Sequence, residues 1–235
     1  MTKHIPNFIT SLNLTSGFIA ITFAANGQIV TASWLILAAM IFDFMDGFSA
    51  RLLKKYSEIG KELDSLADVV SFGVAPGFII YQLLMKSLSS APVTGLQTVL
   101  ILAVAAIMAV CAALRLAKFN IDTTQATTFR GLPTPACAIG VISVVISAHY
   151  SQSPVFNTFL ESPAALAVFS IVLSLLMVTR IPLLSLKVKS LKFKGNEGRY
   201  ILIGSVLLSF AILGISAAPL IIPLYLIASL LSPLF

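Results

Sequence analysis

A series of long apolar runs is the feature that most restricts what this chain can fold into. Eight such runs follow one another with only short polar connections between them. A helix that crosses a bilayer needs about 20 apolar residues, and hydrocarbon offers backbone groups no hydrogen-bond partner, so each run is expected to be helical. We therefore expect an all-α, polytopic transmembrane helix bundle of about eight helices, a six-helix core plus two C-terminal helices. The expected helices cover about residues 6–25, 29–50, 63–85, 95–116, 133–150, 163–178, 200–217 and 219–234.

The composition agrees with a membrane protein. Of the 235 residues, 58% are hydrophobic and only 10% are charged, with a mean hydropathy of +1.00. The short connections leave no separate soluble domain, so we expect one membrane-embedded domain over residues 1–235. The first residues lack the charged region and cleavage site of a secretory signal, and the first helix is expected to stay.

The basic residues are divided unevenly between the two ends of the expected helices. If eight helices alternate in direction, 14 of the 15 lysines and arginines fall at one end, and only Lys86 falls at the other. Cytoplasmic loops of membrane proteins carry such an excess. We interpret the net charge of +6 as a topology signal and not as a nucleic-acid surface. The chain is thus expected in the inner, cytoplasmic membrane with both termini facing the cytoplasm. An alternative with six membrane-spanning helices and two segments at the membrane interface keeps the same orientation.

Four of the nine acidic residues form two closely spaced pairs at the basic end. Asp43 and Asp46 end the second expected helix, and Asp64 and Asp68 open the third. These spacings place each pair on one helical face, and a short loop between antiparallel helices brings the pairs together. One uncompensated Asp at the centre of a bilayer costs about 2.5 to 3.5 kcal/mol. Crowded carboxylates without His or Cys nearby favour a hard divalent cation, Mg²⁺, Mn²⁺ or Ca²⁺.

The acidic pairs belong to a longer motif, Asp-x2-Asp-Gly-x2-Ala-Arg-x8-Gly-x3-Asp-x3-Asp. This motif resembles the signature of the CDP-alcohol phosphatidyltransferases, integral membrane enzymes of phospholipid synthesis. The resemblance implies a CDP-linked lipid as donor, Mg²⁺ or Mn²⁺ as cofactor, and a homodimer. It also implies that Asp43, Asp46 and Asp64 bind metal, and that Asp68 is both the catalytic base and a further metal ligand. Every fixed position is present: Asp43, Asp46, Gly47, Ala50, Arg51, Gly60, Asp64 and Asp68.

Three residues of the motif are expected to bind the CDP-lipid. Gly47 and Ala50 lack bulk, which lets a nucleotide approach the helix backbone, and Arg51 offers a fork of N–H donors to phosphate. Plain helix packing is the alternative for the two small residues. Gly60 is expected at a close-packing or turn position.

A second stretch bears on the acceptor. Arg115-Leu-Ala-Lys118-Phe-Asn120, Phe129-Arg130-Gly131-Leu-Pro133-Thr-Pro135 and Ser71-Phe72-Gly73-Val-Ala-Pro76 resemble the phosphatidylserine synthases within the family. This resemblance implies transfer of the phosphatidyl group from CDP-diacylglycerol to the hydroxyl of L-serine, giving phosphatidylserine and CMP. A basic cluster on the catalytic face also supplies what an amino-acid carboxylate needs. We expect this cluster in and around the loop after the fourth helix: Arg115, Lys118, Asn120 and Arg130.

Other interpretations stay open at this point. A phosphorylated acceptor such as glycerol 3-phosphate or an inositol phosphate would use the same bases, and the bases could instead only anchor the cytoplasmic interface. A cation-coupled transporter also uses intramembrane carboxylates, although such sites usually lie near the midplane on broken helices. A structural scaffold leaves the acidic cluster without a cause.

Small and polar residues also recur at helical spacing in the first expected helix. They either face the active site or form a helix-packing seam. These residues are Asn7, Thr10, Asn13 and Gly17.

Overall fold

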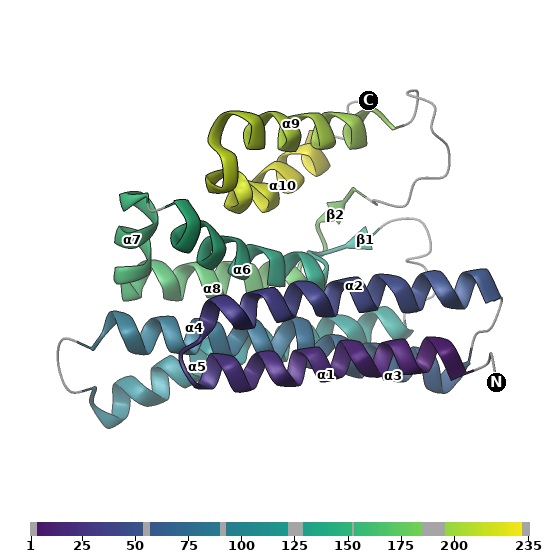
Figure 1. The fold of residues 1–235 in the computed structure, drawn as a ribbon, viewed down its shortest axis with the longest axis horizontal. Coiled ribbons are helices and arrows are strands. Elements are labelled where there is room, and N and C mark those ends of the chain that lie inside the picture. The colour runs from purple at the N-terminus through teal and green to yellow at the C-terminus, as the bar shows by residue number, and fades with distance from the viewer. Residues whose placement is uncertain are drawn as a thin grey trace.

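The computed structural model describes residues 4–53, 57–89, 93–121, 129–151, 153–184 and 196–231, and this part of the chain is almost wholly helical (Figure 1). Seven of the lysines counted above lie outside these ranges: Lys3, Lys54, Lys55, Lys187, Lys189, Lys192 and Lys194. The elements are α1 (Ile5–Ala25), α2 (Ile29–Leu53), α3 (Glu58–Asp68), the π-helix η2 (Val69–Val74), α4 (Ala75–Ser87), α5 (Gly95–Ile121), β1 (Phe129–Arg130), α6 (Thr134–Ser151), α7 (Pro154–Glu161), α8 (Pro163–Val178), β2 (Pro182–Leu183), α9 (Glu197–Leu213), the 3₁₀ helix η4 (Gly214–Leu220) and α10 (Ile221–Leu231).

The expected polytopic helical bundle is confirmed. Within the described ranges, six continuous helical runs are long and apolar enough to cross a membrane, and α7 with α8, which meet at 87°, make a seventh if the bent pair is one span. The last run, Glu197–Leu231, folds back on itself, so that α9 and α10 form a hairpin (Figure 1). The eight expected segments all overlap these helices, and the last two are the halves of this hairpin.

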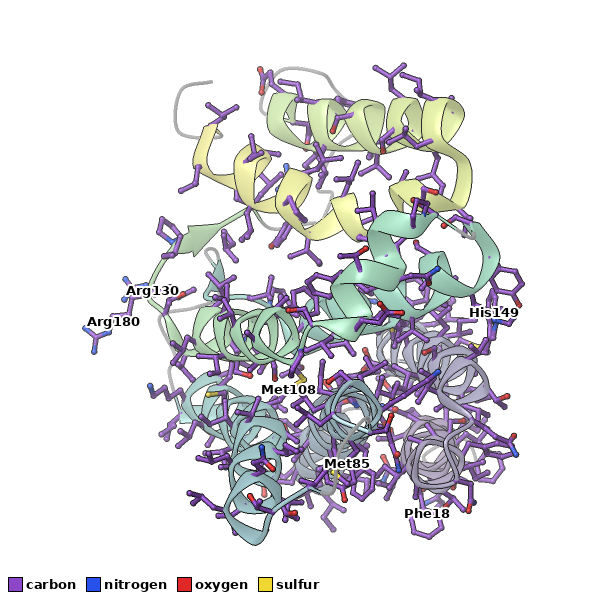
Figure 2. All side chains as sticks on the ribbon, turned by 90° about the vertical axis from the view of Figure 1, so that its left-hand side faces the viewer. Phe18, Met85, Met108, Arg130, His149 and Arg180 are labelled. Atoms are coloured by element: carbon purple, nitrogen blue, oxygen red, sulfur yellow. The ribbon has the colours of Figure 1, made fainter. Side chains whose placement is uncertain are left out.

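The helix α1 shows how the bundle packs. Its inward positions carry small or polar residues, whereas Phe8 and Phe18 point outward with 64% and 66% of their surface exposed (Figure 2 shows Phe18). Lipid is as apolar as these rings, so helices associate in it through close packing and hydrogen bonds rather than by hiding apolar surface. The buried positions of α1 are Pro6, Thr10, Asn13, Ser16, Gly17, Ala20 and Ala24.

The span from α3 to α4 changes its helical form immediately after Asp68. In η2 the N–H of Ala75 donates to the carbonyl oxygen of Val70, five residues earlier, and Pro76, which has no N–H, follows at the start of α4. Such π-turns often occur at functional sites. Asp68 is thereby buried in the interior of the bundle, while the residues of η2 and α4 pack against α5.

Two glycines allow that tight packing against α5. A Cβ on Gly73 would lie 2.8 Å from the Cβ of Ala112, and one on Gly77 would lie 2.8 Å from the carbonyl oxygen of Ala105. Only residues without a side chain permit this approach. The helical run that holds Asp64 and Asp68 is thereby fixed against α5.

The helix ends that the sequence predicted to lie on the basic face are found together at one end of the bundle. The N-terminal end of α1, the end of α2, the start of α3, the end of α5, and both short strands lie there, on the right of Figure 1. The α1–α2 turn and the end of α4 lie at the opposite end (Figure 1). The described helices therefore alternate in the way that the charge asymmetry requires.

Candidate active site

Three carboxylates from α2 and α3, two helices that both pack against α1, lie close together. Ligand atoms of Asp43, Asp64 and Asp68 all lie within 4.8 Å of one another. Asp43 comes from the second half of α2, and the other two stand one turn apart on α3. The antiparallel arrangement expected from the sequence thus brings the two acidic pairs together.

These residues fit a divalent cation. Asp46 is buried one turn after Asp43, and one oxygen each of Asp46 and Asp64 is buried without a hydrogen-bond partner in the described part of the chain. Burying such oxygens without a partner is costly, and one cation satisfies several of them at once. A donor set made of carboxylates alone suits Mg²⁺ or Mn²⁺.

A cavity of about 660 Å³ opens beside the carboxylates. A Cβ added to Gly47 would meet no described atom within 4 Å, so Gly47 forms cavity wall rather than a packing contact. Gly60 is different, since its Cβ would lie 2.8 Å from Oδ1 of Asn7, as expected for close packing. The lining residues are Pro6, Asn7, Thr10, Asp46, Gly47, Ala50, Arg51, Ser57, Glu58, Gly60, Lys61 and Asp64.

The small and polar residues of α1 were expected either to face the active site or to form a helix-packing seam, and the structure shows some in each position. Asn7 and Thr10 line the cavity. Asn13 is fully buried and donates through Nδ2 to Oδ1 of Asp68 at 3.2 Å, and its carbonyl oxygen accepts from Ser71 Oγ at 3.0 Å. Gly17 lies at a seam, where a Cβ would be 2.8 Å from the Cα of Ser71. The sequence pointed to Asn13 only as one polar residue in an apolar run.

A second cavity, of about 460 Å³, is basic. Arg115, Lys118 and Arg130, three of the four residues expected to bind the acceptor, line it together with Arg180. Arg180 follows α8 and is not among the residues that the sequence predicted to bind the acceptor, but Figure 2 shows it beside Arg130 at one edge of the molecule. Arg115 also lies within electrostatic range of Asp68. Arg115 is therefore the residue of the basic cavity that interacts electrostatically with the acidic cluster.

Asn120, the fourth of these residues, is held in a different way. Its Nδ2 donates to Ser65 Oγ at 2.9 Å, and its carbonyl oxygen accepts from Lys61 Nζ at 3.1 Å. These bonds tie the end of α5 to α3. The expected loop position is wrong for Arg115, Lys118 and Asn120, because α5 continues to Ile121; Arg and Lys are good helix formers, so the helix outlasts its apolar run.

A short antiparallel pairing of β1 with β2 brings Arg130 and Arg180 to the same cavity. Arg130 pairs with Pro182, and the N–H of Gly131 donates to the carbonyl oxygen of Ile181 at 3.0 Å. Gly131 has φ +75°, and a Cβ there would lie 2.8 Å from the carbonyl oxygen of Thr179. Only glycine fits this position without strain.

Comparison with known proteins shows the family of this chain. The sequence model of the CDP-alcohol phosphatidyltransferases matches residues 3–188. The chain belongs to this family. The CDP-diacylglycerol–serine O-phosphatidyltransferase of Helicobacter pylori strain 26695 is 33% identical over 235 residues, covering 98% of this chain and 91% of the relative. The enzyme of the same name from Bacillus subtilis strain 168 is 36% identical over 179 residues, covering 76% and 89%.

An archaeal relative carries a related name. The archaetidylserine synthase of Methanothermobacter thermautotrophicus is 36% identical over 150 residues, 63% of this chain and 60% of the relative. A CDP-alcohol phosphatidyltransferase is a transferase, and membership therefore favours the enzyme over the transporter and the scaffold.

Replacing Asn13 by Ala is expected to lower the transfer rate about 10- to 100-fold, because Asp68 loses a buried donor to a charged group, an interaction of about 1.5 to 3 kcal/mol. CMP release by purified protein measures the rate. Asn26→Ala is the matched control, since Asn26 donates only to the carbonyl oxygen of Thr22 at the opposite end of α1. Equal rates for both variants and the unmodified protein contradict the positioning role.

Proposed function

We propose that this CDP-alcohol phosphatidyltransferase moves the phosphatidyl group from CDP-diacylglycerol to the hydroxyl of L-serine, releasing CMP and phosphatidylserine. The basic cavity of Arg115, Lys118, Arg130 and Arg180 beside Asp68 is the observation that carries this proposal. The names of relatives at 33% and 36% identity support the serine assignment.

The donor is proposed to occupy the 660 Å³ cavity between α1, α2 and α3. Gly47 and Ala50 leave room for the nucleotide, and Arg51 lies at the rim to meet phosphate, while the acyl chains stay in the bilayer. Asp43, Asp46, Asp64 and Asp68 would hold Mg²⁺ or Mn²⁺, which when bound neutralises the diphosphate and stabilises the charge of the leaving group.

The acceptor is proposed to enter from the basic cavity. Arg115, Arg130 and Arg180 would bind the serine carboxylate, which directs the hydroxyl toward Asp68. Asp68 accepts the hydroxyl proton while the oxygen bonds to the lipid-side phosphorus. The bond from that phosphorus to the CMP oxygen breaks, and CMP leaves with the electron pair. A positioned base of this kind contributes about 10²- to 10⁴-fold.

A phosphorylated acceptor such as glycerol 3-phosphate is the second candidate. Four cationic side chains line the basic cavity, which is more positive charge than one carboxylate needs. The acidic cluster would perform the same chemistry on either acceptor.

Acceptor dependence is the direct test. With CDP-diacylglycerol and Mg²⁺ or Mn²⁺, CMP release by the purified protein is expected to require L-serine, and to stay at background with glycerol 3-phosphate, an inositol phosphate or no acceptor. Chelation of the cation is expected to stop release. Release with another acceptor alone keeps the acidic cluster's role and overturns the serine assignment. No release under any condition, from folded protein, overturns the transferase proposal.

Asp68→Asn is expected to reduce CMP release by about 10²-fold or more, since an amide still accepts the hydrogen bond from Asn13 but cannot take the hydroxyl proton. Thermal unfolding in detergent checks that the variant is folded. Glu161→Gln, at the far end of α7, serves as the control and is expected to keep full activity. Normal turnover by folded Asp68→Asn removes Asp68 as the base.

The site is further proposed to face the cytoplasm, because the basic residues gather at its end of the bundle. A cysteine at Ser89, beyond α4, is expected to react with a membrane-impermeant maleimide in intact cells, and one at Glu62 on α3 only after permeabilisation; Cys111 and Cys137 are buried and give little background. The reverse pattern contradicts this orientation. The homodimer stays a prediction from the family resemblance.

A further inference from the structure

The C-terminal hairpin is bonded to Leu184, the residue directly after β2, and β2 pairs with β1, whose Arg130 lines the basic cavity. The hairpin lies beyond residues 3–188, which the family model matches. On α10, the hydroxyl of Tyr225 donates to the carbonyl oxygen of Leu184 at 3.0 Å, and the N–H of Leu184 donates to Ser229 Oγ at 3.0 Å. Ser229 Oγ in turn donates to the Tyr225 carbonyl oxygen at 2.7 Å. Both polar groups of Leu184, directly after β2, are thus held by α10.

This contact reaches the cavity through the strand pairing. Arg180 lies two residues before β2, and Arg130 lies in β1, which pairs with β2. Two strands of two residues each are not stable by themselves, so further contacts must hold them. On the bundle side, Gly131 bonds to Ile181 and Leu132 bonds to Leu176 at the end of α8. On the other side, α10 supplies the bonds of Tyr225 and Ser229.

Tyr225 also approaches the cavity itself. Its side chain is buried, with 5% of its surface exposed. It lies within electrostatic range of Arg115, whose Nε is buried without a hydrogen-bond partner among the described residues. Tyr225 therefore lies within electrostatic range of Arg115 and also bonds Leu184, the residue directly after β2.

We propose that α10 is a brace for the acceptor site, and that Tyr225 and Ser229 are positioning residues that fix the β1–β2 wall with Arg130 and Arg180. This inference rests on the proposed function of the basic cavity as the acceptor site. The donor cavity is independent of the brace, because its described lining residues come from α1, α2, α3 and the residue before α3.

Steady-state kinetics of Tyr225→Phe and Ser229→Ala in the full chain tests the proposal. Each variant loses one bond to Leu184, so KM for L-serine is expected to rise about three- to tenfold, while KM for CDP-diacylglycerol stays within about twofold. Tyr150→Phe and Ser209→Ala are matched controls: Tyr150 is exposed on α6, and Ser209 donates only to Val206 within α9. Both controls are expected to keep the unmodified KM values.

A double variant separates the brace from general loss of stability. Arg180→Ala already removes one of the side chains that Tyr225 is proposed to position. Tyr225→Phe is therefore expected to raise the KM for serine less in the Arg180→Ala variant than in the unmodified protein. Faster amide exchange at Leu184 in Ser229→Ala checks the bond itself and does not depend on activity.

The outcomes distinguish this inference from the proposed function. If the unmodified protein shows no serine-dependent CMP release, the proposed function fails, and with it the assignment of the cavity that is braced. If it does release CMP, and Tyr225→Phe and Ser229→Ala keep the unmodified KM for serine, the brace is overturned. Equal rises in the KM for both substrates also overturn it, because they indicate a general defect.

Discussion

The burial of carboxylates inside an apolar bundle is the constraint on which the rest of this structure depends. Asp46 and Asp68 are buried, and Asp43 and Asp64 are half-buried beside them. In such surroundings each charge needs a partner. The chain offers Asp68 the amide of Asn13 and leaves oxygens of Asp46 and Asp64 free within the described residues. That division fits a site with one fixed base and with ligands ready for a cation.

Holding Asp68 in place requires three helices to approach closely. Because Gly17 has no side chain, Ser71 packs closely against α1. Ser71 donates to the carbonyl oxygen of Asn13, the residue that donates to Asp68. Gly73 and Gly77 admit α5 on the other side. In lipid, where apolar surface gains little by burial, such contacts between small residues are a main source of helix association. The same glycines that hold the bundle together therefore also define the geometry of the site.

The two cavities give the two substrates of the proposed reaction separate binding places. The donor cavity is made by the first three helices, close to each other in the chain, whereas the basic cavity combines α5, β1 and the residues after α8. Asp64 of the acidic cluster lines the donor cavity, and Arg115 of the basic cavity lies within electrostatic range of Asp68. A lipid and a polar acceptor can thus approach one base from different sides.

The sequence by itself determined the helical membrane class and the acidic motif, because bilayer thickness fixes the length of apolar runs and helical periodicity places Asp43 with Asp46 and Asp64 with Asp68. It also placed three of the four bases of the second cavity. It did not identify Arg180, the link from Asn13 to Asp68, or the contact of Tyr225 with Leu184. These contacts join residues 41 to 55 positions apart or depend on two-residue strands, which leave no periodic signal. Only the tertiary structure decided them, because close packing of distant helices, and not local pattern, sets which polar groups become partners.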